Sequence, residues 1–141
     1  MHPADRAAEW SLLQNQFDSY EKYSLVIKLT NVIMLALSAL LDRSTLLVGC
    51  LVGTLWLQDA IWKTFQSRIE SRLLKLESSL GEESTGEAGG FIPYQFNSEY
   101  IQNRGSSLAL IGEYLDQAVR PTVAFPHAVL LAVWLATYIG G

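Results

Sequence analysis

Along the chain, apolar residues gather into three long blocks that are separated by polar segments. The blocks cover residues 24–41, 45–62 and 122–139, and the only full charges inside them are Lys28 and Asp59. Each block reaches the length of roughly 18 residues that crossing a bilayer requires. Three such blocks leave too little polar sequence to cover them in water. The pattern therefore predicts an all-α integral membrane protein with three transmembrane helices.

The connection between the first two blocks is short. Only Asp42, Arg43 and Ser44 separate them, which is typical of an antiparallel helical hairpin. Outside both blocks, apolar residues continue to recur at helical gaps of three and four. The two stripes are Trp10, Leu13, Phe17 and Tyr20, and Trp62, Phe65, Ile69, Leu73, Leu76 and Leu80. We expect residues 1–80 to form a membrane hairpin whose arms extend into the cytoplasm as an antiparallel coiled coil.

The segment after the hairpin changes character at residue 81. The sequence GEESTGEAGG opens residues 81–97 and predicts a flexible acidic, glycine-rich linker. An aromatic patch follows, in which Phe91, Tyr94 and Phe96 are candidates for docking a protein partner.

The C-terminal region, residues 98–141, combines an amphipathic pattern with the third span. Asn97 or Ser98 can cap a helix. Pro121 ends or kinks that segment and suits the first turn of the following span. The residues expected on the apolar face of the first helix are Leu108, Ile111, Leu115 and Ala118.

Composition and charge restrict the classes of function. Half of the 141 residues are hydrophobic and 17% are charged, and the net charge of −4 gives no electrostatic reason to bind nucleic acid. Cys50 is the only cysteine, which excludes an intrachain disulfide and a cysteine-rich metal site. The sequence contains no catalytic motif. We expect no enzyme activity, cofactor or metal.

The distribution of Lys and Arg predicts the orientation in the membrane. Eight of the nine basic residues that flank the blocks lie on one side of the expected membrane. The positive-inside rule then puts the N-terminus and residues 63–121 in the cytoplasm and the C-terminus outside, with a bacterial inner membrane as the expected location.

Lys28 and Asp59 lie at equal distances along the chain from the Arg43–Ser44 midpoint. The hairpin therefore places them opposite each other. Each charge alone costs about 2.5–3.5 kcal/mol inside a membrane, so pairing is the natural compensation. The pair is either an ion-linked or proton-linked site, or a salt bridge that fixes the register. The same facing rule puts Arg68 and Arg72 near Asp18 and Glu21.

Other polar or small residues in the blocks are also candidates for a role in function or packing. Asn31 and Ser38 share a face with Lys28, and this face either lines a pore or forms a polar seam between helices. Gly49 and Gly53 form a GxxxG pattern that permits close helix packing. His127, near the cytoplasmic start of the third span, is either a packed or hydrogen-bonded residue or a proton-linked one.

Two functional hypotheses follow. The first is a homo-oligomeric, pore-like or channel-like protein surrounded by membrane lipid. The alternative is a non-conducting scaffold or regulatory subunit that docks a partner through its cytoplasmic helices. A pore predicts Asn31 and Ser38 facing a shared axis, whereas a scaffold predicts these residues buried between helices.

Overall fold

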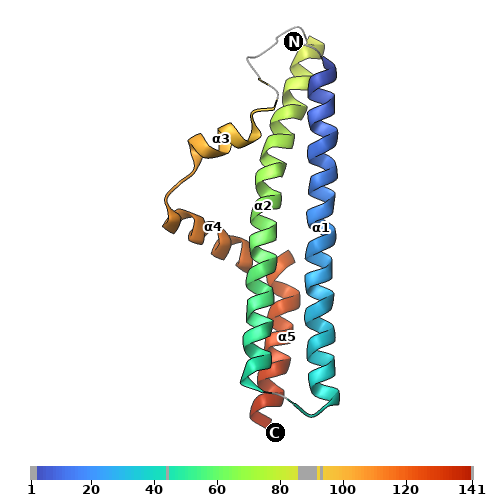
Figure 1. Cartoon of the computed structure of the whole chain (residues 1–141), viewed down its shortest axis with the longest axis vertical. Coiled ribbons are helices and arrows are strands. Elements are labelled where there is room, and N and C mark those ends of the chain that lie inside the picture. The colour runs from blue at the N-terminus through green and yellow to red at the C-terminus, as the bar shows by residue number, and fades with distance from the viewer. Residues whose placement is uncertain (1–2, 44, 86–91, 93, 141) are drawn as a thin grey trace.

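The computed structural model describes residues 3–43, 45–85, 92 and 94–140. Within these ranges the chain forms five helices and no strand. The helices are α1 (Pro3–Leu40), α2 (Leu46–Thr85), α3 (Phe96–Asn103), α4 (Ser107–Val119) and α5 (Pro121–Gly140). The long helices α1 and α2 run antiparallel, and α5 lies beside the half of this pair that contains the connecting turn (Figure 1).

Three of these helices, α1, α2 and α5, are long and apolar enough to cross a membrane. The prediction of an all-helical chain with three such segments is confirmed. Their surfaces carry many exposed large apolar side chains, including Leu25, Val26, Leu29, Leu47 and Val129. Such an outer surface is suited to lipid, because in water it would exceed the apolar patches that soluble monomers tolerate.

The two apolar stripes outside the blocks meet where α1 and α2 continue past α5. Leu13 on α1 packs with Ile69, Leu73 and Leu76 on α2 to form a buried cluster, which we call the arm core. Trp10, Phe17 and Tyr20 pack against it from α1, and Phe96 does so from α3. Burial of these side chains holds the distal halves of α1 and α2 together.

Ser38 organises the turn between α1 and α2. Its hydroxyl donates to the carbonyl of Arg43 at 2.7 Å, while the Arg43 N–H donates to the carbonyl of Ser38 at 2.9 Å. Asp42 adopts a left-handed φ of 50°, a conformation that Asp tolerates better than most residues. These bonds satisfy carbonyl and amide groups that the end of a helix leaves unpaired.

The region after α2 differs from the expectation in two places. Helix α2 continues to Thr85, so the first five residues of the expected linker are helical, and residues 86–91 lie outside the described ranges. The single expected amphipathic helix is divided into α3 and α4. Ser106 is the reason for the division. Its backbone is extended, and its side-chain hydroxyl caps α4 by accepting a hydrogen bond from the N–H of Ala109. Helix α3 has Gln95 at its N-cap, where no side-chain cap bond forms.

Helices α4 and α5 are joined by Arg120 alone. Figure 1 shows that α4 extends sideways from the start of α5, across the long axis of α1 and α2. The chain thus consists of a three-helix part, an arm made by the distal halves of α1 and α2, and the bent pair α3 and α4 beside that arm.

Candidate functional site

Three helices contribute to a polar cluster inside the three-helix part. Ser24, Lys28 and Asn31 come from α1, Asp59 from α2 and His127 from α5. We call these five residues the buried polar cluster. Asn31, Asp59 and His127 are all 0% exposed, and the side chain of Lys28 is 19% exposed. Burying polar groups among apolar helices is unfavourable unless these groups bind one another. The buried polar cluster is therefore the candidate functional site.

The carboxylate of Asp59 lies at the centre of the cluster. One oxygen, Oδ1, accepts a hydrogen bond from the hydroxyl of Ser24. The other oxygen, Oδ2, lies 3.1 Å from Nε2 of His127 and 3.5 Å from Nζ of Lys28. The structure therefore brings Lys28 and Asp59 together and adds His127, which sequence spacing could not relate to them.

His127 contacts the rest of the cluster through both ring nitrogens. Its Nδ1 lies 2.8 Å from the side-chain Nδ2 of Asn31, which also donates to the carbonyl of Val52 at 3.5 Å. An amide nitrogen can only donate, so with the Asn31 amide in this orientation Nδ1 of His127 accepts and the ring proton belongs on Nε2, facing Asp59. The indole of Trp56 stacks on the imidazole with 6.4 Å between ring centroids. Lys28 and Asp59 contribute one charge of each sign to the cluster.

One polar atom of the cluster is left without a partner in the described part of the chain. The side-chain Oδ1 of Asn31 is buried and has no hydrogen-bond partner among the described residues. Rotating this amide by half a turn would bring Oδ1 next to Nδ1 of His127. The cost would be the contact between Nδ2 and the carbonyl of Val52.

Nucleophilic and metal chemistry are not favoured by this arrangement. Ser24 and His127 both bind the carboxylate of Asp59, so the imidazole does not activate the hydroxyl as it would in a Ser–His–Asp triad. Among the described residues, no group of three or more His, Cys, Asp or Glu side chains could hold a metal ion.

Gly49 and Gly53 have different surroundings. A Cβ at Gly49 would overlap the indole of Trp134 on α5, whereas a Cβ at Gly53 would meet nothing within 4 Å. The indole N–H of Trp134 also donates to the carbonyl of Thr45 at 3.0 Å. Gly49 therefore permits the close approach of α5 to α2, while Gly53 leaves open space.

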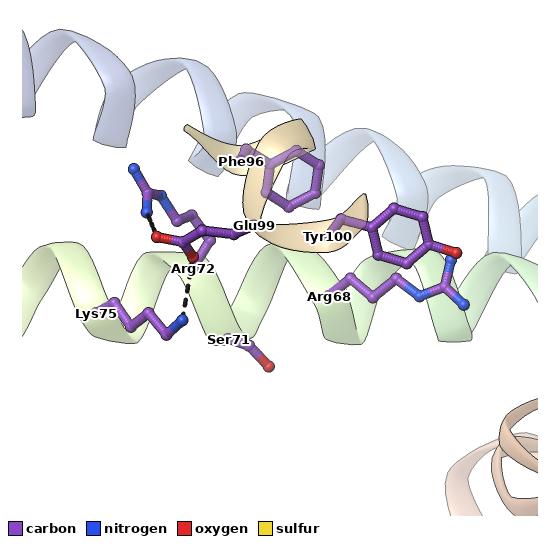
Figure 2. Close-up of a pocket in the computed structure, with 7 residues that line it drawn as sticks. All are labelled: Arg68, Ser71, Arg72, Lys75, Phe96, Glu99 and Tyr100. Atoms are coloured by element: carbon purple, nitrogen blue, oxygen red, sulfur yellow. Dashed lines mark hydrogen bonds and ion pairs between the residues drawn. The ribbon is translucent and has the colours of Figure 1, made fainter. Parts of the chain in front are cut away.

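A second polar network connects the arm to α3. The guanidinium of Arg72 donates to Glu9 at 2.9 Å, to Glu99 at 2.5 Å and to the carbonyl of Ile92 at 2.9 Å. Figure 2 shows Arg72 and Lys75 converging on Glu99, with Phe96 and Tyr100 beside them. Burial raises the pKa of Glu99, but the hydrogen bond from Lys75 and the charges of Arg72 and Lys75 lower it more, so the net shift is downward.

The predicted partners of Arg68 and Arg72 are wrong. Arg68 pairs with Glu113 on α4 at 2.8 Å and lies over the ring of Tyr100, while Arg72 pairs with Glu9 and Glu99. Glu113 and Glu99 belong to α4 and α3, which fold back beside α2 and which the facing rule for α1 and α2 does not include. Glu9 lies on α1, but closer to the N-terminus than the two carboxylates that the rule selects.

The predicted docking patch is divided. Phe96 packs against the arm core, and Tyr94 is 58% exposed with its backbone N–H bound to Glu9. Phe91 lies outside the described residues. Of the described patch residues, Tyr94 is thus the one that presents an aromatic side chain to solvent.

Comparison with known proteins assigns no family to the chain. No protein-family model, curated protein or solved structure matches it.

Proposed function

We propose that the chain is a small, non-conducting scaffold or regulatory subunit of a bacterial inner membrane, and that it docks a partner on the cytoplasmic side. One observation carries this proposal: the polar face of the first span is turned inward. Asn31 is 0% exposed and binds groups of α2 and α5, and Ser38 is 7% exposed and closes the turn. This arrangement supports a seam between helices in preference to a pore wall.

The energetics support the same conclusion. Lys28 and Asp59 compensate each other within one chain, and Ser24 and His127 saturate the carboxylate further. A second copy is therefore not needed to pair these charges. The exposed large side chains around them, such as Val32, Ile33 and Leu57, are apolar and suit lipid.

The cytoplasmic side offers a surface suited to a protein partner. A pocket opens between α2, α4 and the segment that joins α3 to α4, and we call it the docking pocket. Its lining includes Ser71, Arg104, Glu113, Asp116 and Arg120, so both signs of charge meet there. Mixed charge around a concavity favours a protein segment over nucleic acid, whose partners carry positive surfaces. The positive-inside rule supports the cytoplasmic placement of this pocket and of the arm.

Conductance measurements test the non-conducting part of the proposal. Purified protein in planar bilayers should give no unitary current above that of protein-free membranes. A reproducible unitary conductance that changes in an Asn31→Leu variant, shown to insert to the same extent as the original chain, would support a pore and contradict the scaffold.

Site-specific crosslinking tests the docking part. A photo-reactive residue in place of Ser71, inside the docking pocket, should give a discrete adduct with another protein in intact cells. Leu12 is the matched control, because it is exposed on the arm and does not line this pocket. Equal adducts at both positions, or none at Ser71, would contradict docking at the pocket, and an adduct of twice the chain mass would indicate a homo-oligomer.

A further inference from the structure

Helix α4 carries a continuous apolar stripe that nothing in the described chain covers. Leu108, Ile111, Leu115 and Val119 recur at gaps of three, four and four, which places them on one face of a helix. Their exposed fractions are 79%, 52%, 58% and 70%. Four large side chains at this exposure need an apolar neighbour.

The opposite face of α4 is occupied by the chain itself. Gln117 is buried, Leu110 is half-buried, and both line the docking pocket beside α2. Glu113, on the same side of the helix, pairs with Arg68 of α2 at 2.8 Å. These contacts fix the rotation of α4, so the apolar stripe points away from α2 and away from the pocket.

The depth of α4 follows from its C-terminal end. The carbonyl of Ala118 accepts a hydrogen bond from the indole N–H of Trp56 at 3.1 Å. Trp56 lies six residues before Trp62, the end of the second apolar block, which corresponds to about 9 Å of helix. The end of α4 therefore reaches the depth at which the second block is still within the membrane.

The connection to α5 also indicates that α4 lies close to the membrane. Arg120 is the only residue between α4 and α5, and α5 is long and apolar enough to cross a membrane. Figure 1 shows α4 lying across the axis of the three-helix part at the start of α5. A helix that leaves the start of a span at this angle runs along the surface of the bilayer.

We propose that α4 is an interfacial helix whose apolar stripe is inserted into the cytoplasmic surface of the lipid bilayer. The inference rests on the membrane placement of α5 and is independent of whether the protein conducts ions. Helices of this kind bury their apolar face by about 5–10 Å at the boundary between headgroups and acyl chains. Between Ser107 and Val119 the charges are Glu113 and Asp116, both acidic, so apolar burial drives the insertion and anionic lipid is not required.

Spin labelling of neighbouring positions tests the proposal. In a Cys50→Ala background, nitroxide labels are attached to Leu115→Cys, Ile111→Cys and Asp116→Cys variants reconstituted into phosphatidylcholine vesicles. Collision with oxygen, which concentrates in lipid, is compared with collision with a water-soluble nickel complex. We expect the ratio of oxygen to nickel accessibility to be severalfold higher at residues 111 and 115 than at residue 116.

Three outcomes would overturn the inference. Nickel accessibility at residue 115 equal to that at residue 116 would place the stripe in water. Exclusion of both reagents at residue 115, together with dipolar broadening between labels, would identify a second copy as its cover. A label at Ile33→Cys, an exposed position on α1, provides the reference: if it is also accessible to nickel, the membrane placement itself fails.

Discussion

Adding one methyl group at Gly49 should weaken the attachment of α5, whereas the same change at Gly53 should not. The new Cβ at Gly49 would overlap the six-membered part of the Trp134 indole, at atoms Cζ2, Cε2 and Cη2. This ring cannot retreat freely, because its N–H is bound to the carbonyl of Thr45 at 3.0 Å and its face stacks on Tyr138 at 5.3 Å. Gly53 has open space around it and serves as the matched control.

The expected magnitude follows from three contributions. Replacing Gly by Ala inside a helix stabilises it by about 0.5–1 kcal/mol at either position. At Gly49 alone, overpacking costs about 1–3 kcal/mol, and loss of the bond from Trp134 to Thr45 costs about 0.5–1.5 kcal/mol. Since the helix contribution is common to both variants, the free energies of unfolding of Gly49→Ala and Gly53→Ala should differ by about 1.5–4.5 kcal/mol.

The assay is reversible unfolding in mixed micelles, with helical circular dichroism as the readout for the original chain and both variants. Gly53→Ala should unfold at the same or a slightly higher fraction of denaturing detergent than the original chain. Gly49→Ala should unfold earlier. Equal unfolding curves for the two variants would refute the placement of Trp134 against Gly49.

Three further outcomes are expected. Lys28→Met or Asp59→Asn alone should destabilise the chain by up to about 3–5 kcal/mol. The double variant should be less destabilised than the sum of the two single effects, which a double-mutant cycle in micelles would detect. Additive effects would contradict the pairing. Hydrogen bonding from Lys63 holds the pKa of Glu21 below its ordinary value of 4.5, so this contact stabilises the arm at neutral pH and is lost as the pH falls below 4.5 through the lower folded pKa. Thermal unfolding of the original chain and of Glu21→Gln from neutral to acidic pH checks this, and an unchanged acid dependence in the variant would speak against it. Ser106→Ala should cost about 0.5–2 kcal/mol through loss of the cap, and faster amide hydrogen exchange should appear in the first turn of α4 and not in α5.

The parts of the fold that depend on local spacing could be predicted from the sequence. Two helices joined by a connection of only a few residues must run antiparallel, so the hairpin follows from the short connection between the first two blocks. Equal distances from the turn then relate Lys28 to Asp59 across the two helices. The stripes that form the arm core were also predictable, because each has the helical period over a long segment.

The parts that depend on how separate helices meet could not be predicted in this way. Periodicity does not reveal which face α5 presents to α1 and α2, so His127 could not be assigned to Asp59 and Asn31. A usable signal was nevertheless present: in spans with so few polar groups, each buried polar side chain needs another as its partner. The partner of Gly49 depends on the same docking of α5, and the partners of Arg72 depend on the return of α3.

The continuity of α2 would carry a change of tilt from the proposed membrane span to the arm. Its 40 residues form one helix, about 60 Å long at 1.5 Å per residue. In a bilayer, helices adapt to a change in hydrocarbon thickness by tilting, and a tilt of about 5° at one end of such a rod would move the other end by about 5 Å. In the proposed scaffold, a change in membrane thickness would therefore move a partner bound at the arm without any change in the fold of the chain.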